Sequence, residues 1–200
     1  SVQELLDVGC GTGQSKQIYE GSYRKYTGID LSESAIAKAK VDHPQAKWIV
    51  GDACALPIPD ESIDVVAFSS LLHHIPVFPI AVQEAARVLK PGGIVFAFDP
   101  NLLHPAMALL RHPKSPLYLS AGVSPNERPL LPSELYRAFN SAQFQDIYQR
   151  GQSDIPYRQV APRLVNLFLS VYNVADWCWE RMQLGRKFGT FVVTSAQKPE

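Results

Sequence analysis

The sequence predicts an α/β fold built on a parallel sheet, and three observations support this prediction. Short apolar runs typical of strands alternate with segments of helical character through the first hundred residues. Glycines cluster where the first of these runs ends. The chain has 200 residues, enough for one domain with a sizeable buried core. Alternating strands and helices form βαβ units, in which the strands run parallel.

Five strands are predicted in the first half of the chain. In order, they are Val2–Val8, Tyr26–Asp30, Lys47–Gly51, Ile63–Ser69 and Gly93–Asp99. The first is a short apolar run that ends at glycines. The fourth is almost continuously apolar, as expected of a strand that is covered on both faces.

Three helices are predicted between these strands: Thr12–Glu20, Leu31–Lys40 and Pro79–Leu89. The side chain of Ser32 can accept a hydrogen bond from the free backbone N–H groups at the start of the second helix. Pro91-Gly92-Gly93 is expected to stop the third helix.

The regular alternation breaks after the fifth strand. Asn101–Pro132 contains six prolines and cannot hold a long uninterrupted helix. A loop of this length often serves as a lid or a binding segment. Ser133–Ala142 has apolar residues at helical spacing, and strands are predicted at Phe144–Arg150 and Gly189–Ala196.

Gln159–Arg181 is predicted to be an amphipathic helix with a broad apolar face. Its polar stripe consists of Gln159, Arg163, Asn166, Ser170, Asn173 and Glu180. Three interpretations stay open: packing in the core, contact in a homodimer, or contact with a lipophilic ligand or a membrane surface. The polar stripe is not rich in lysine, which weighs against an anionic membrane.

Composition excludes several classes of protein. Lys plus Arg equals Asp plus Glu, at 19 each, so the net charge is zero and a basic nucleic-acid-binding surface is not expected. The three cysteines have no CxxC spacing, which argues against a zinc site or a disulfide framework and favours a reducing compartment. The longest charge-free apolar stretch near the C-terminus, Leu164–Ala175, is too short to span a bilayer. We therefore expect a cytoplasmic protein, and because Ser1 is not methionine we expect the natural chain to extend further at this end.

A glycine-rich turn joins the first predicted strand to the first predicted helix. Gly9, Gly11 and Gly13 allow positive φ angles and let a ligand approach the backbone. A helix start also offers free N–H groups to an anion. The spacing is G-x-G-x-G, and Gln14 departs from the G-x-G-x-x-G of dinucleotide-binding proteins. The turn could also be purely structural.

An acidic residue at the end of the second strand favours a nucleoside ligand. Asp30 lies 17 residues after Gly13 (30 − 13), near the roughly 20 expected for a carboxylate that binds ribose hydroxyls. Both features fall at carboxyl ends of strands, where open parallel sheets bind ligands. The alternative is that Asp30 only serves the start of the following helix.

The sequence resembles the class I S-adenosylmethionine-dependent methyltransferases, in particular the ubiquinone-biosynthesis-like group (methyltransferase type 11). Four motifs carry the resemblance: LLDVGCGTGQ, YTGIDLSESAIAKAK, GDACALPIPDESIDVVAFSSLLHHI and RVLKPGGIVFAFDPN. They cover Glu4–Asp99, and Leu131–Lys198 matches only by the order of its elements. The resemblance implies a Rossmann-like doubly wound, mostly parallel seven-stranded sheet with the last strand antiparallel.

The resemblance also implies how the chain is organised as a single domain. Residues 1–99 would form the half that binds the cofactor, and the proline-rich insertion 100–132 would lie on the substrate side. Residues 133–200 would form the C-terminal half, which includes the amphipathic helix at about 159–181.

S-adenosylmethionine is the cofactor that the resemblance implies, and the glycine turn would lie along its methionine portion. Gly9, Gly11 and Gly13 would let the backbone pass close to the ligand. Asp7 would order the turn. Cys10, within the turn, is expected to be a small packing residue of the binding segment.

The remaining cofactor contacts are carried over to four positions after the turn. Asp30 would hold the ribose diol, and Leu31 would pack on the adenine. Asp52 would accept a hydrogen bond from the adenine amino group, with the backbone of Ala53 beside it. Ser69 would contact the methionine end through its backbone. Carboxylates are suitable acceptors for hydroxyl and amino donors.

His73 and His74 are the candidates for a catalytic base. They follow the fourth strand, and a neutral histidine can take a proton from an oxygen or nitrogen acceptor near cytosolic pH. Contact with cofactor or substrate, or a structural role, are the alternatives. His104, Glu127 and Arg128 in the insertion are candidates for substrate contact, with a solvated loop face as the expected alternative.

The predicted function is methyl transfer from S-adenosylmethionine to an oxygen, nitrogen or carbon of a small, hydrophobic acceptor. No metal and no nucleic-acid partner are expected. The apolar helix at 159–181 suggests peripheral membrane contact or a homodimer. One alternative is a non-catalytic subunit that binds the cofactor. A nicotinamide-dependent oxidoreductase is a second, disfavoured by Gln14 and by the GDA and LKPGG segments.

Overall fold

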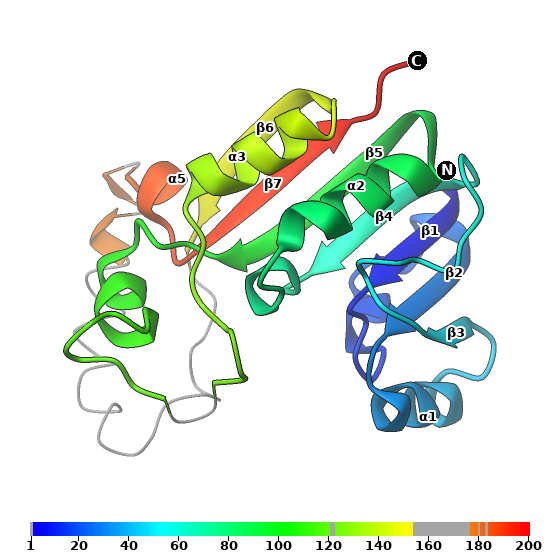
Figure 1. The fold of residues 1–200 in the computed structure, drawn as a ribbon, viewed down its shortest axis with the longest axis horizontal. Coiled ribbons are helices and arrows are strands. Elements are labelled where there is room, and N and C mark those ends of the chain that lie inside the picture. Colours follow the sequence, from blue (N-terminus) through cyan, green and yellow to red (C-terminus); the bar gives the residue numbers. More distant parts are fainter. Residues whose placement is uncertain (1, 121–122, 154–176, 180, 183) are drawn as a thin grey trace.

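A mixed seven-stranded sheet dominates the computed structural model, which describes residues 2–120, 123–153, 177–179, 181–182 and 184–200 (Figure 1). The strands are β1 (Val2–Val8), β2 (Tyr23–Asp30), β3 (Lys47–Val50), β4 (Ile63–Ser69), β5 (Leu89–Pro100), β6 (Gln145–Gln152) and β7 (Phe191–Gln197). The α-helices are α1 (Glu33–Asp42), α2 (Phe78–Val88), α3 (Pro132–Ser141) and α5 (Gly185–Phe188). Shorter helical turns are η1 (Gln14–Gln17), η2 (Leu72–His74) and η3 (Met107–Arg111).

The strand order is β3-β2-β1-β4-β5-β7-β6. Strands β1 to β5 pair parallel, whereas β7 pairs antiparallel with both β5 and β6. This confirms the predicted Rossmann-like sheet with its antiparallel last strand. The chain runs outward from β1 to β3 and then returns to place β4 on the other side of β1. The carboxyl ends of β1 and β4 therefore flank a topological switch point, the usual place for a ligand in such sheets.

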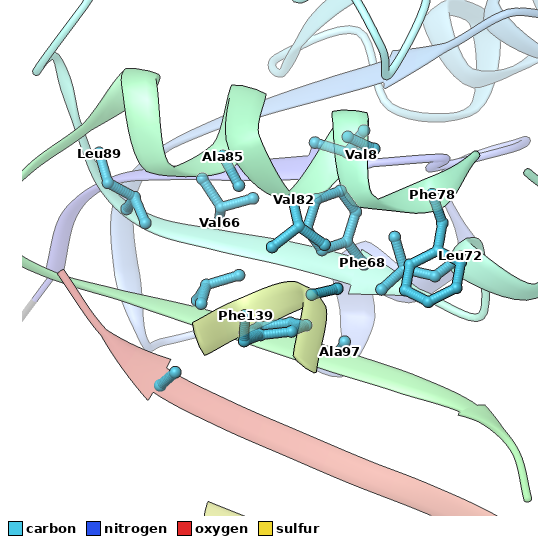
Figure 2. Close-up of a cluster of buried hydrophobic side chains, with 14 of the residues drawn as sticks. Val8, Val66, Phe68, Leu72, Phe78, Val82, Ala85, Leu89, Ala97 and Phe139 are labelled. Carbon is cyan, nitrogen blue, oxygen red and sulfur yellow. The ribbon is translucent and has the colours of Figure 1, made fainter. Parts of the chain in front are cut away.

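Two layers of apolar side chains cover the sheet, because successive residues of a strand point to opposite faces. Leu6 of β1 belongs to the main cluster with α2 and α3, whereas the adjacent Leu5 belongs to a second cluster with α1. In the main cluster, Phe68 and Phe139 are fully buried (Figure 2). The second cluster centres on Trp48 and lies beneath the segment that follows β1.

The predicted helix Thr12–Glu20 is wrong, because only the short 3₁₀ turn η1 forms there. The residue before it, Gly13, has a left-handed backbone (φ 84°) and caps the turn with no side-chain hydrogen bond. The amides of Ile18 and Tyr19 bond to carbonyls three residues back, not four. Without an N-terminal cap and with Gly21 close behind, the segment does not extend into an α-helix.

The expectation that Pro91-Gly92-Gly93 stops a helix is also wrong. Helix α2 already ends at Val88, and the tripeptide lies inside the long strand β5. Gly92 has φ 74°, and its N–H donates to the carbonyl of Lys198 at 3.1 Å. The register between β4 and β5 shifts between the pairs Ile63–Leu89 and Val65–Ile94, so the tripeptide forms a bulge in β5.

Most other predicted elements form with ends shifted by one to four residues, and the predicted strands Val2–Val8 and Ile63–Ser69 have the same bounds as β1 and β4. Ser32 caps α1 as predicted, since its side chain accepts from the amide of Ala35. In the described part of the insertion, the longest helical segment is residues 105–111, of which η3 forms the last five. The predicted helix Gln159–Arg181 lies mostly outside the described residues. The described residues within it, Trp177–Trp179 and Arg181, are helical.

Candidate functional site

The glycine-rich turn follows β1 at the switch point, and its three glycines have positive φ angles of 77°, 53° and 84°. A side chain at Gly9 would meet Leu71, and one at Gly13 would come within 2.5 Å of the Trp48 ring. At Gly11, by contrast, nothing lies within 4 Å of the position of a Cβ atom. Side chains of the protein therefore pack against the turn at Gly9 and Gly13, whereas the space beside Gly11 is open.

Asp30 joins this turn to the end of β2. Its Oδ2 accepts from the amide of Gly11 at 2.8 Å, and its Oδ1 accepts from the amide of Ser32 at 2.9 Å. Each carboxylate oxygen can accept a second hydrogen bond, so the side chain keeps acceptor capacity for a ligand. Asp30 does contribute to the start of α1, as the alternative interpretation holds, but the side-chain cap of that helix is Ser32.

Leu31 and Asp52 extend this site along the carboxyl edge of the sheet. Strands β2 and β3 pair so that Asp30 lies opposite Val50, two residues before Asp52. Leu31 is 73% exposed, an unusual position for a large apolar side chain. Asp52 is exposed, and its Oδ1 accepts from the amide of Cys54 at 2.8 Å. Ala53 packs partly against the main core.

Asp7 lies fully buried on β1 beneath the turn. Its Oδ2 accepts from the hydroxyl groups of Tyr26, at 2.6 Å, and of Ser15. Burial raises the pKa of Asp7, although these hydrogen bonds favour its charged form. Its Oδ1 has no hydrogen-bond partner among the described residues. Asp7 therefore holds the chain that follows the turn against β2.

The side chain of Cys10 points away from the open side of the turn. It is buried in the second cluster beside Trp48, and its thiol is free. Burial raises the pKa of the thiol, which makes a reactive thiolate unfavourable. This agrees with the expected packing role, and only the backbone of Cys10 is placed to meet a ligand.

Ser69, at the end of β4, contacts a residue that the sequence did not single out. Its Oγ lies 2.7 Å from the hydroxyl of Tyr19. Because Tyr19 follows η1 and Ser69 ends β4, this hydrogen bond crosses the switch point. The next residue, Ser70, has a left-handed backbone with φ 59°, so the chain turns sharply away from the strand.

His73 is buried against β5. Its Nδ1 lies 2.8 Å from Oδ1 of Asp99, and its backbone N–H donates to the same oxygen at 3.1 Å. Asp99 is fully buried, and its Oδ2 has no hydrogen-bond partner among the described residues. The pairing of Ser69 with Phe98 explains the contact, because it places the end of β4 beside Asp99.

His74 is the more accessible of the two histidines, with 36% of its side chain exposed against 5% for His73. The two rings are 3.9 Å apart between centroids. The Nδ1 of His74 lies 2.6 Å from Oγ of Ser124 and 3.7 Å from Oε2 of Glu127. Burial, and secondly the neighbouring His73, lower the pKa of His74, so the neutral form is favoured.

The expectation of a solvated loop face is wrong for His104 and Glu127. His104 is buried and packs edge-on to Trp179, with ring centroids 5.8 Å apart. The side chain of Glu127 is 12% exposed and is paired with Arg111 at 3.0 Å. Arg128 pairs with Glu134, and its amide donates to the carbonyl of His73. These residues attach the insertion to η2 and α3.

Metal-ligand geometry is absent from the described residues, where no group of three or more His, Cys, Asp or Glu could hold an ion. Within the same part of the chain, no helix is both long enough and apolar enough to cross a membrane.

The fold and this site correspond to a known class of proteins. Residues 6–97 match the methyltransferase domain family. This part of the chain therefore matches a methyltransferase domain, which confirms the resemblance that the four motifs indicate for it.

Curated relatives share this domain. The demethylmenaquinone methyltransferase of Staphylococcus aureus (strain MRSA252) is 39% identical over 106 residues, which cover 49% of this chain and 43% of the relative. The 2-methyl-6-phytyl-1,4-hydroquinone methyltransferase of Synechocystis is 41% identical over 101 residues, which cover 48% of this chain and 32% of the relative. The chain thus matches less than half the length of either relative.

Solved structures share the fold over the whole chain. The Haloferax volcanii protein solved in complex with the Trm112 methyltransferase activator superposes with a TM-score of 0.71 at 19% identity. The match covers 100% of this chain and 84% of that one.

Proposed function

We propose that this protein transfers a methyl group from S-adenosylmethionine to a small, hydrophobic acceptor of the quinone type. The observation that carries the proposal is the hydrogen bond between Asp30 and Gly11, which sets a carboxylate beside an open glycine turn at the switch point. The names of two relatives support the acceptor class, since demethylmenaquinone and a phytyl hydroquinone are both quinone-type molecules.

The residues at the switch point fit the cofactor. The space beside Gly11 is open, so a ligand can approach the backbone there. Asp30 would accept from the ribose hydroxyls, and Asp52 from the adenine amino group. The exposed side chain of Leu31 would cover one face of the adenine. Ser69 and the glycine turn would lie along the methionine portion.

The bound cofactor supplies a methyl group that is already activated on a positively charged sulfonium. The chain itself has to orient the acceptor, exclude water and accept a proton from it. His74 is the proton acceptor that we propose, because it is accessible and its lowered pKa favours the neutral form. His73, held by Asp99, supports the ring of His74 from behind.

Calorimetric titration with S-adenosylhomocysteine tests the cofactor site. We expect the folded protein to bind it and the Asp30→Ala variant to bind at least about tenfold more weakly, a loss of ~1.4 kcal/mol. Asp42→Ala is the matched control, because that carboxylate lies at the end of α1 and pairs only with Lys38 on the surface. A folded, full-length protein that binds no S-adenosylhomocysteine would contradict the proposal.

Turnover assays separate the proposal from its alternatives. Transfer of a labelled methyl group to a reduced, demethylated quinone would support the enzyme. Tight cofactor binding without turnover on any acceptor would instead support a non-catalytic subunit. Binding of NADH in place of S-adenosylhomocysteine would support an oxidoreductase.

The division of the chain into a cofactor half, an insertion and a C-terminal half stays a prediction, as do a cytoplasmic location and a lack of nucleic-acid partners. Contact with a membrane or a second copy through 159–181 also stays a prediction, because most of that segment lies outside the described residues.

A further inference from the structure

A chain of polar contacts runs from the insertion to His74. The carboxylate of Glu127 accepts from Arg111 through Oε1, at 3.0 Å. Its other oxygen, Oε2, accepts from both the amide and the hydroxyl of Ser124, at 2.9 and 3.2 Å. The hydroxyl oxygen of Ser124 in turn lies 2.6 Å from Nδ1 of His74. Four side chains from two segments thus form one continuous network.

The direction of the hydrogen bonds in this network can be deduced from proton counting. A serine hydroxyl carries one proton, and the proton of Ser124 is used by Glu127, whose ionised carboxylate can only accept. With this proton directed to Glu127, the oxygen of Ser124 accepts from His74, and Nδ1 of His74 carries a hydrogen. In the neutral imidazole, the lone pair is then on Nε2.

We propose that Glu127, acting through Ser124, is a positioning residue that holds His74 in the Nδ1–H tautomer and leaves Nε2 as the proton acceptor. This inference rests on the proposed function, because only a reaction that removes a proton from the acceptor needs such a base. It also narrows the acceptor to molecules that lose a proton at or next to the reacting position, as in a hydroquinone.

The surroundings of His74 are consistent with this role. Among the described residues, the charged and titratable groups that face it are Glu127 from the insertion and His73 from η2, with Asp99 of β5 behind the latter. Arg111 neutralises Glu127, so the network carries no net charge toward the ring. Burial lowers the pKa of His74, which keeps the ring neutral and able to accept a proton.

A backbone hydrogen bond also holds the insertion against η2. The amide of Arg128, one residue after Glu127, donates to the backbone carbonyl of His73 at 3.2 Å. The guanidinium of Arg128 pairs with Glu134 at 3.0 Å. Ser124 and Glu127 are therefore placed against His74 by backbone as well as side-chain contacts.

Long-range ¹H–¹⁵N NMR on the full chain, labelled at histidine, tests the tautomer directly and needs neither cofactor nor acceptor. The protein has five histidines, so His74→Gln identifies the signals of His74 by their loss. At neutral pH we expect His74 to show a protonated Nδ1 and an unprotonated Nε2. A protonated Nε2 with a bare Nδ1 would overturn the inference.

Variants test whether Ser124 and Glu127 are responsible for the tautomer. Ser124→Ala and Glu127→Gln should shift His74 toward a mixture of tautomers, whereas Ser124→Thr keeps the hydroxyl and should retain the wild-type spectrum. Glu134→Gln is the matched control, since Glu134 also pairs with an arginine of the insertion but makes no contact with His74. An unchanged tautomer in Ser124→Ala would contradict the inference.

Kinetics then link the tautomer to turnover. Ser124→Ala should lower kcat by about tenfold or more, within the range for general-base catalysis, with KM changed less than about twofold. Ser124→Thr should restore kcat. If the spectra change as expected but no quinone-type acceptor is methylated, the proposed function fails while the assignment of the tautomer stands. If turnover occurs and Ser124→Ala leaves both kcat and its pH profile unchanged, the positioning role is overturned.

Discussion

The side chain of Asp30 accepts a hydrogen bond from the backbone N–H of Gly11 at 2.8 Å. One carboxylate thereby joins the carboxyl ends of two neighbouring parallel strands, β1 and β2, beside the switch point between β1 and β4. A substitution that moves the glycine turn should therefore also move the carboxylate of Asp30, and a substitution of Asp30 should also move the turn.

Asp30→Asn should weaken cofactor binding. The amide oxygen can still accept from one backbone N–H group, but its NH₂ group cannot accept from the second or from a ribose hydroxyl. We expect at least about tenfold weaker binding of S-adenosylhomocysteine, which corresponds to ~1.4 kcal/mol. Calorimetry measures the affinity, and a variant with wild-type affinity would refute the role of Asp30.

Gly13→Ala should destabilise the fold more than Gly11→Ala. Both glycines have positive φ, but a Cβ at Gly13 would come within 2.5 Å of the Trp48 ring, whereas one at Gly11 meets nothing within 4 Å. Backbone strain alone costs about 1–3 kcal/mol, and the clash adds to it at Gly13. Urea unfolding measures both variants. Trp48→Phe should recover part of the loss in Gly13→Ala, and equal losses at the two glycines would contradict this account.

Phe139→Ala should remove about 3–5 kcal/mol from the free energy of unfolding, the usual cost of such a cavity. The Phe139 ring is fully buried in the main cluster (Figure 2). It lies 5.6 Å from the Phe144 ring between centroids. Tyr136→Ala, on the same helix but 48% exposed, is the control and should change the stability by less than about 0.5 kcal/mol. Chemical denaturation compares the two, and similar losses would show that Phe139 is not part of the core.

Glu84 should contribute stability that disappears in acid. Its hydrogen bonds from Arg87 hold the pKa of Glu84 below the ordinary 4.5. A carboxyl group with a lowered pKa in the folded state stabilises the protein above its unfolded pKa, and this contribution is lost as the pH falls through the folded pKa. Glu84→Gln should therefore be less stable than wild type at pH 7, with a difference that persists at pH 5 and shrinks in urea titrations at pH 4 and pH 3. A difference that stays constant with pH would exclude this ionic contribution.

Elements governed by local pattern could be predicted from the sequence. The bounds of β4 are correct because its apolar run is long enough to be covered on both faces and is bordered by polar residues. The order of strands and the sites at their carboxyl ends follow from the alternation of elements and from the resemblance. Gly11, Asp30 and Asp52 come together at one edge for the same reason.

Contacts made by tertiary structure could not be predicted in this way. η1 replaces an α-helix because its first residues are held by Gly13 and by the hydrogen bond from Ser15 to Asp7. The hydrogen bond between Tyr19 and Ser69 depends on the path of the chain after η1. The predicted helix Thr12–Glu20 would have pointed the side chain of Tyr19 in another direction. The role of Ser124 depends on how the insertion returns to η2, a path that proline content alone does not determine.

The position of Lys198 and Glu200 beside the start of β5 has a practical consequence for labelling the protein. Lys198 donates its amide to Gly93 and its ammonium group to Leu89, at the amino end of β5. Because β7 runs antiparallel to β5, Glu200 lies at the edge of the sheet opposite the switch point, as Figure 1 shows for the end marked C. A fluorophore or surface linker attached at Glu200 would leave the carboxyl edge facing outward, so immobilised protein should keep its ligand site accessible.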